Sequence, residues 1–283
     1  MMLSIVARTG SFGGALLWIY CATVFIFLLA PILVIVPLSF SSSTFFSYPI
    51  PSWSFRWYEA FFSNTDWRNA IRNSFIVGFA TSALATPLGI TAALGLRRSA
   101  SRFKSIAFGI FIAPLIVPVI ITACGLYFFL VEVHLINTFP GLIASHVVIA
   151  VPFVILMVTA ALNNLDPALQ RAAAGLGAPP LRVFFDVTLP LILPGVVAAA
   201  VLAFVASFDD VIIVNFVAGV DQTTMPKELW KGIRDETSPL VLSVSTVMIT
   251  VSTVVLAVVE IARRNRGRAN IPTPSFGATP SKR

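Results

Sequence analysis

Charged residues are scarce in this 283-residue chain: they make up 11% of it, whereas hydrophobic residues make up 57%. An ordinary soluble domain carries roughly 25% charged residues. A water-soluble fold of this length could not bury so much apolar surface. The low charge content therefore excludes an ordinary soluble protein and favours a chain whose solvent is the lipid bilayer.

Cysteine is equally scarce, and Cys21 and Cys124 both fall within apolar runs. A cysteine in such a position commonly behaves as a small apolar residue, so the sequence predicts no disulfide, redox or metal site. The chain also lacks the Gly-x-x-x-x-Gly-Lys-Ser/Thr loop that cradles nucleotide phosphates. The sequence therefore predicts no nucleotide-binding loop of this type, and no cofactor is expected on this chain.

Long stretches without charged residues make up most of the sequence. Each supplies about 20 apolar residues, the length that a helix needs to cross roughly 30 Å of hydrocarbon. The first stretch is longer than the core of a signal peptide, which has about 7–15 residues. We predict an all-α, polytopic membrane protein with six spans, at 14–40, 70–96, 105–130, 141–162, 191–219 and 239–261.

The net charge is +7, and the placement of the basic residues along the chain agrees with the predicted topology. With the N-terminus in the cytoplasm, most of the 19 Lys and Arg residues fall on the inner side, as the positive-inside rule requires. Both termini are then cytoplasmic. Nucleic-acid binding requires basic residues gathered on one folded face, and the topology already accounts for these charges without it.

One predicted inner segment, 163–190, is too long for a simple turn. Asp166 followed by Pro167 predicts a helix start, because a capping carboxylate precedes a ring suited to the first helical position. Gly175 and Gly177 predict its end. A second amphipathic stretch, 181–187, then leads to the fifth span. By pattern alone the segment could also be an amphipathic helix lying on the bilayer.

The residues of this segment resemble the EAA loop of type I ABC importer permeases. The loop motif reads Glu-Ala-Ala, three residues, Gly, nine residues, Ile, one residue, Leu-Pro. The matching positions, in which Arg171 replaces the Glu and Val187 the Ile, are Arg171, Ala172, Ala173, Gly177, Val187, Leu189 and Pro190.

The resemblance covers residues 70–262 and implies a permease domain whose loop at 163–190 contacts a cytoplasmic ATPase subunit. Residues 1–69 would form an additional helix and a first periplasmic loop, and residues 263–283 a basic cytoplasmic tail. The implied partners are a second permease subunit, two ATPase copies, a periplasmic solute-binding protein and the lipid of the inner membrane. ATP would be used by the ATPase alone.

A second local match concerns the cargo. Ser207-Phe208-Asp209-Asp210-Val211, with Phe216-Val217-Ala218-Gly219 beyond it, resembles the spermidine/putrescine group of permeases. A later run from Met225 to Pro239 is similar to that group's second permease. The resemblance implies a polyamine or a related organic amine. The group also contains carriers of opines and other small organic solutes, which remain an alternative.

Two adjacent aspartates within a predicted span require a physical reason. A carboxylate at the centre of a membrane helix costs on the order of 2.5–3.5 kcal/mol. Counting from Leu191 at about 1.5 Å per residue places Asp209 about 27 Å along the helix, toward its outer end. Asp209 and Asp210 are candidates for contact with a cationic cargo. The alternative is a structural or gating role, in which one aspartate caps a helix or bonds to a neighbouring one and the other reaches the outer interface. Asn215 is a weaker candidate, and His146 is expected to be a hydrogen-bonded packing residue.

Other functional classes are less consistent with this pattern. Intramembrane aspartyl proteases require two carboxylates that face each other and share a proton, whereas adjacent helical residues point about 100° apart. An enzyme is therefore not expected. A secondary transporter or channel remains the alternative from another class, and it would operate without an ATPase.

Overall fold

A computed structural model describes residues 11–99, 102–236, 239–251 and 253–254. These residues are mainly helical, and no strand occurs among them beyond an isolated bridge between Ser41 and Trp53. The chain divides into two compact units, Phe62–Glu236 and a unit that combines Met1–Phe61 with Thr237–Arg283. The all-α class is confirmed for the described residues, and the predicted tail at 263–283 lies outside them.

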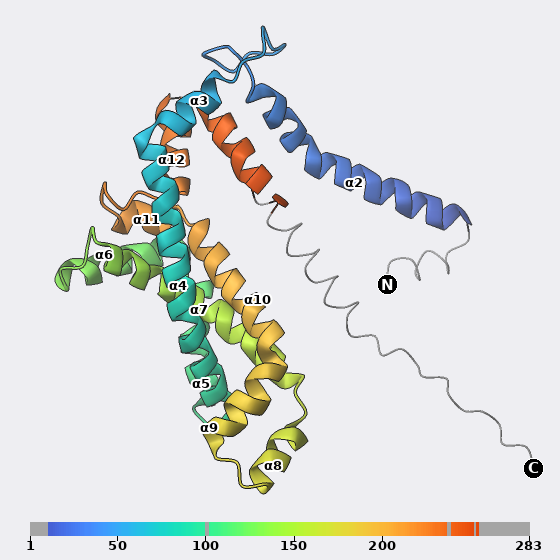
Figure 1. The fold of residues 1–283 in the computed structure, drawn as a ribbon, viewed down its shortest axis with the longest axis vertical. Helices are drawn as coiled ribbons and strands as arrows, with labels where there is room; N and C mark the ends of the chain where they lie inside the picture. The colour runs from blue at the N-terminus through green and yellow to red at the C-terminus, as the bar shows by residue number, and fades with distance from the viewer. Residues whose placement is uncertain (1–10, 100–101, 237–238, 252, 255–283) are drawn as a thin grey trace, which may run out of the picture. The chain divides into compact units, whose positions relative to one another are not determined.

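Three long helices form the core of the larger unit (Figure 1): α4 (Thr65–Arg98), α7 (Phe139–Asn163) and α10 (Leu189–Phe208) pack against one another. In α7 and α10 apolar residues surround the helix on every side, as expected for helices enclosed by lipid and by other helices. The buried residues at the three-helix contact are largely small or β-branched, namely Ala85, Ala93, Ala150, Val154, Val158, Leu162, Leu165, Ile192, Val196, Ala199 and Ala203.

Glycine permits the closest approaches between these helices. A Cβ added at Gly89 of α4 would overlap Val154 of α7, and one added at Gly195 of α10 would lie 2.6 Å from Ala161 Cβ. Small residues let helix backbones approach each other in lipid, where no hydrophobic effect drives the helices together. The contact thus depends on dispersion forces and on the absence of side chains.

The predicted span at 105–130 is not one straight helix. α5 (Lys104–Ile116) and α6 (Val119–Glu132) meet at an angle of 102°. The cause is Pro118, because a proline ring pushes the preceding residue out of the helical region. Val117 accordingly has extended backbone angles (φ −71°, ψ 133°).

The predicted start of the fifth span also differs from the structure. After α8 (Pro167–Gly175), the short α9 (Pro180–Arg182) and a π-helical turn, η1 (Val183–Thr188), lead into α10 without a break. Leu189 N–H donates to Phe184 O, five residues earlier. This wider turn relieves the crowding that a proline ring causes in a helix interior, so Pro190 lies within a continuous helix over Pro180–Phe208 rather than at its start.

The fifth span also ends earlier than predicted. α10 stops at Phe208, and a short helix, α11 (Ile212–Val217), follows a break at residues 209–211. The aspartate pair therefore lies between two helices and not inside one. This is a correction to the predicted span at 191–219.

The polypeptide beyond α11 is held to the start of α4. Asn73 Nδ2 donates to the carbonyl oxygens of Asp221 and Thr223, at 2.8 and 2.9 Å, and Met225 N–H donates to Ser74 Oγ. Two short helices follow there, α12 (Met225–Lys231) and the π-helical η2 (Gly232–Glu236). Polar residues early in α4 thus fix a segment distant in sequence.

The smaller unit contains α2 (Ser11–Leu38), most of α3 (Arg56–Ser63) and a helix over Leu240–Val251. Ser39 connects them, because its hydroxyl lies 2.6 Å from Tyr58 Oη and its carbonyl accepts from Ser243 Oγ. The most apolar stretch of α2 buries no residue against the described part of the chain. Such a helix requires lipid or another subunit around it.

Within the described residues, four helices are long and apolar enough to cross a membrane: Gly14–Leu38, Thr65–Arg98, Phe139–Asn163 and Pro180–Phe208. A fifth span results if α5 and α6 count as one bent span. The helix over Leu240–Val251 covers only the first half of the predicted span at 239–261, whose remainder is largely outside the described residues. Six spans therefore remain a prediction.

We expect Gly89→Ala to destabilise the larger unit, because its methyl group has no room beside Val154. Overpacking of this kind costs about 1–3 kcal/mol. The matched control is Gly95→Ala in the same helix, where no atom lies within 4 Å of the added carbon. Thermal midpoints in detergent, followed by gel filtration, should fall for Gly89→Ala only. Equal midpoints for the two variants would contradict the close α4–α7 contact.

Candidate functional site

The loop helix α8 is closed at both ends by local hydrogen bonds. At its start Asp166 Oδ1 accepts from Ala168 N–H at 2.8 Å, as predicted for an N-cap. At its end, Gly177 N–H bonds to Ala174 O and Ala178 N–H bonds to Ala173 O, which is the Schellman pattern. Gly177 is left-handed, with φ +85°. The backbone therefore favours glycine here, since most other residues adopt this conformation at a cost of about 1–2 kcal/mol.

The matched loop positions differ in exposure. Arg171 and Ala172 are exposed, Ala173, Val187 and Leu189 are half-buried, and Pro190 is exposed. Arg171 makes no ion pair with any described residue, whereas Arg182 lies 3.9 Å from Asp186.

Three large apolar side chains of this loop lie exposed on the protein surface: Leu176, Leu181 and Phe185 are 90%, 73% and 58% exposed. They follow the loop from the end of α8 into η1. Exposed apolar residues of this kind mark surfaces that contact another protein or a membrane. Leu181 and Phe185 belong to the amphipathic stretch predicted at 181–187, whereas the exposure of all three side chains is known only from the structure.

A hydrogen-bonded pair joins α8 to the start of the long helix. Gln170 Nε2 donates to Thr188 Oγ1 at 2.9 Å, and the buried Thr188 hydroxyl donates to Val183 O in the π-turn. A displacement of α8 therefore acts directly on η1, which continues into α10.

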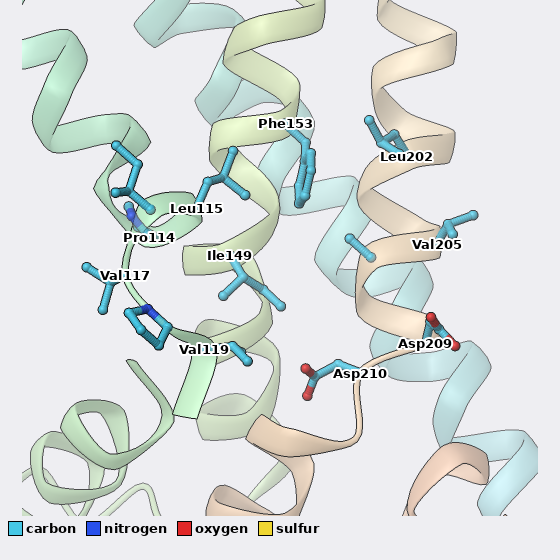
Figure 2. Close-up of a pocket in the computed structure, with 13 residues that line it drawn as sticks. Pro114, Leu115, Val117, Val119, Ile149, Phe153, Leu202, Val205, Asp209 and Asp210 are labelled. Atoms are coloured by element: carbon cyan, nitrogen blue, oxygen red, sulfur yellow. The ribbon is translucent and has the colours of Figure 1, made fainter. Parts of the chain in front are cut away.

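A groove opens where the two broken helices meet (Figure 2). Its volume is about 570 Å³. One wall is the proline break between α5 and α6, the second belongs to α7 and α10, and the end of α10 closes it. Its lining is apolar apart from two carboxylates and consists of Pro114, Leu115, Ile116, Val117, Pro118, Val119, Ile149, Phe153, Leu202, Val205, Ala206, Asp209 and Asp210.

The two carboxylates point in different directions. In Figure 2 the Asp210 carboxylate points into the groove, toward the side of Ile149, and the Asp209 carboxylate points away from it. Asp210 is 9% exposed at its side chain, whereas Asp209 is exposed. Asn215 lies exposed on α11 and does not line the groove. The structure thus brings Asp210 and, at the rim, Asp209 to the groove and leaves Asn215 apart.

Charged groups complete both ends of α11. Asp210 Oδ1 accepts from the N–H groups of Ile213 and Val214, at 2.8 and 3.3 Å. At the other end Lys227 Nζ donates to the carbonyl oxygens of Val214 and Ala218, at 3.4 and 3.0 Å. Burial lowers the pKa of the Lys227 ammonium, and the neighbouring Glu228 carboxylate opposes that shift. The signs of both charges suit the helix dipole, so the capping role considered for the pair belongs to Asp210.

His146 of α7 lies fully buried behind Asp210. Its Nδ1 is 2.6 Å from Ser207 Oγ of α10, and Ser207 Oγ donates to Thr81 Oγ1 of α4. The hydrogen-bonded packing expected for His146 is therefore present. Its Nε2 has no hydrogen-bond partner among the described residues and lies 3.9 Å from Asp210 Oδ1.

The proximity of His146 to Asp210 was not predicted, because residues 64 positions apart carry no local pattern that relates them. Among the described residues no group of three His, Cys, Asp or Glu side chains could hold a metal ion. A groove of this composition can bind a molecule that is apolar along its length and cationic at one end.

Comparison with known protein families gives a match over residues 85–267. The matched family is described as "Binding-protein-dependent transport system inner membrane component". The match includes the loop at 163–190 and every residue that lines the groove.

The chain is similar to curated permeases over most of its length. It is 32% identical to the putrescine transport system permease protein PotI of Escherichia coli K12, with 80% of this chain and 82% of that protein covered. It is 30% identical to the spermidine/putrescine transport system permease protein PotC of Haemophilus influenzae, with 85% and 93% covered.

Two solved structures share the fold. One is a bacterial ABC transporter for import of the acidic polysaccharide alginate, with a TM-score of 0.72, 13% identity, and coverage of 89% of this chain and 97% of the other. The second, a bacterial alginate ABC transporter in complex with an alginate pentasaccharide-bound periplasmic protein, has a TM-score of 0.68, 17% identity, and coverage of 92% and 95%.

Proposed function

Because this chain belongs to the family of binding-protein-dependent transport system inner membrane components, we propose that it carries a small organic cation of the polyamine class. The chain is a permease subunit of an ABC importer and a component of the inner membrane, and it is not an enzyme. The alternative function considered from the sequence, a secondary transporter or channel, is not the function of this family.

The observation that carries the cargo proposal is the carboxylate of Asp210 at the end of a groove that is apolar apart from Asp210 and Asp209. Putrescine is a four-carbon chain with an ammonium group at each end. Its methylene chain suits the apolar walls, and Asp210 would offset the desolvation of an ammonium group, with Asp209 at the rim. The names of the relatives PotI and PotC support a polyamine over an opine. The alginate importers share only the fold, so the fold does not set the cargo.

The proposed assembly has four further parts. A second permease completes the pathway, two ATPase copies bind on the cytoplasmic side, and a periplasmic solute-binding protein delivers the cargo. The loop at 163–190 is the proposed contact with one ATPase, and its exposed side chains Leu176, Leu181 and Phe185 support this role. ATP binds to the ATPase copies and not to this chain.

Movement would reach the groove through one rigid element. The loop is joined through Gln170 and Thr188 to η1, and the helix from Pro180 runs without a break to Phe208, beside the aspartates. At 1.5 Å per residue this helix is about 43 Å long. We infer that ATPase closure tilts it and thereby opens or closes the groove, because the ATPase binds the two states with different affinity.

The proposal includes six spans with both termini in the cytoplasm. Single cysteines introduced at Leu176 and at Arg98 should be labelled by an impermeant maleimide only after the membrane is opened. Cysteines at Thr138 and Gln222 should react in intact cells. Labelling of position 176 from outside would contradict the ATPase contact, because no cytoplasmic protein could reach the loop.

Coupling should depend on the backbone at Gly177. Asn is tolerated in the left-handed region and a β-branched residue is not, so Gly177→Asn should retain ATP-driven uptake and Gly177→Val should lower it together with substrate-stimulated ATP hydrolysis. Gly175→Ala, a nearby position with open space, is the control. Uptake and hydrolysis are measured in vesicles at matched protein levels. Full activity of Gly177→Val would show that the loop does not transmit the motion.

Cargo contact should depend on the charge of Asp210. Asp210→Asn keeps a side-chain oxygen for the α11 cap but removes the charge. A charge-assisted hydrogen bond is worth roughly 1.5–3 kcal/mol, so putrescine uptake should slow about tenfold or more. Asp209→Asn should have a smaller effect, and Asp66→Asn, an exposed aspartate at the start of α4, should have none.

Uptake is measured with saturating cargo and binding protein. Parental rates in both the Asp209→Asn and Asp210→Asn variants would refute the cargo path. A loss with Asp210→Ala but none with Asp210→Asn would mark Asp210 as a helix cap only.

A further inference from the structure

We propose that His146 and Asp210 share one proton, that a cationic cargo group displaces this proton, and that His146 thereby sets the cation requirement of the groove. This inference rests on the proposed cargo contact of Asp210. The inference adds His146 of α7 to the site, although His146 does not line the groove itself.

The hydrogen-bond chain behind the groove determines where protons lie. The Ser207 hydroxyl donates to Thr81 Oγ1, so its single hydrogen is used. With that hydrogen directed to Thr81, the hydrogen-bond network assigns the ring proton to Nδ1 of His146, which donates to Ser207 Oγ at 2.6 Å. In a neutral imidazole only one ring nitrogen carries a hydrogen. Nε2 of His146 is consequently an acceptor.

This acceptor faces another acceptor. Asp210 Oδ1 lies 3.9 Å from Nε2, and it already accepts from two backbone N–H groups of α11. Nε2 is buried and has no hydrogen-bond partner among the described residues. Two buried lone-pair groups at this separation are unfavourable unless a proton is bound by one of them. One shared proton makes the pair neutral overall, as its apolar surroundings require.

Few other groups compete for this proton. The polar groups on the Nδ1 side of the ring are the hydroxyls of Ser207 in α10 and Thr81 in α4, and neither hydroxyl titrates near neutral pH. Asp209 follows α10 but is exposed and points away from the groove. Lys227 is bonded at the far end of α11. Among the described residues, Asp210 is thus the charged partner of His146.

Cargo and proton then exclude one another. When an ammonium group pairs with the Asp210 carboxylate, the shared proton is lost to water in the groove, onto which Asp210 opens. No covalent bond of the cargo changes, and no electron is transferred. A neutral molecule of the same shape cannot compensate for the proton that it would displace. Low pH should therefore oppose transit of the cation.

The experiment uses the complete transporter in vesicles with equal pH on both sides and putrescine as the probe. Uptake per ATP hydrolysed is measured between about pH 8 and about pH 5.5, a range in which alkyl ammonium groups stay charged. Dividing uptake by ATP hydrolysis removes the pH dependence of the ATPase subunits from the comparison. Because linkage to one proton changes occupancy by up to about tenfold per pH unit, the parental ratio should fall at least about threefold.

His146→Gln retains a hydrogen-bonding side chain that cannot titrate, so its ratio should be independent of pH. The matched control is His134→Asn, because His134 is the other histidine of the chain, is exposed and has φ 55°. This control should keep the parental slope. If His146→Gln does not accumulate, the residual uptake of Asp210→Asn provides the test and should also be independent of pH.

Three results would each overturn the inference: a parental profile without a slope, the parental slope in His146→Gln, or the parental slope in Asp210→Asn. A purely structural role of His146 would lower protein levels and leave the slope unchanged. Failure of the cargo path is a separate result, because Asp210→Asn would then transport putrescine at the parental rate. If Asp210→Asn is slow and His146→Gln keeps the parental slope, only the shared proton is refuted.

Discussion

The break between α10 and α11 depends on one carboxylate. Asp210 accepts hydrogen bonds from the N–H groups of Ile213 and Val214, which no preceding helical turn could satisfy, and so allows a new helix to begin directly after the old one ends. Within a membrane protein, non-helical backbone is tolerated only where protein or a water-filled cavity satisfies it. The groove exists because this condition is met at residues 209–211, and a second break at Pro118 forms the opposite wall. The same oxygen that caps α11 also lies next to His146.

The two parts of the proposed mechanism lie at opposite ends of one helix. The loop helix α8 is bonded to the π-turn, and the helix continues from there to the aspartates. In Figure 1, α8 lies near the start of this helix and α11 beyond its end. A rigid rod transmits a tilt without needing a chain of side-chain rearrangements. The small residues where it crosses α4 and α7 keep the three helices close, so such a tilt would move the groove walls together.

In the loop at 163–190, the residues that set the backbone shape differ from the residue whose charge departs from the motif. The left-handed end of α8 favours glycine at position 177, and this preference would hold whether or not an ATPase binds there. Arg171, in contrast, has no ion pair within the described residues and plays no part in the geometry of the helix cap. The shape of the loop therefore does not depend on the charge at position 171, where related loops carry Glu.

Local sequence was sufficient for the helical class, the membrane setting, the α8 cap at Asp166 and the positions of the loop motif. Apolar length, capping residues and glycine act over a few neighbours, so a single chain segment determines them. Local sequence was insufficient for the helix breaks at Pro118 and Asp210, because proline and aspartate are also tolerated in unbroken membrane helices when neighbours satisfy the backbone. The groove and the approach of His146 to Asp210 depend on how α4, α7 and α10 pack. Those contacts join residues more than 60 positions apart, and only the tertiary structure decides which of them form.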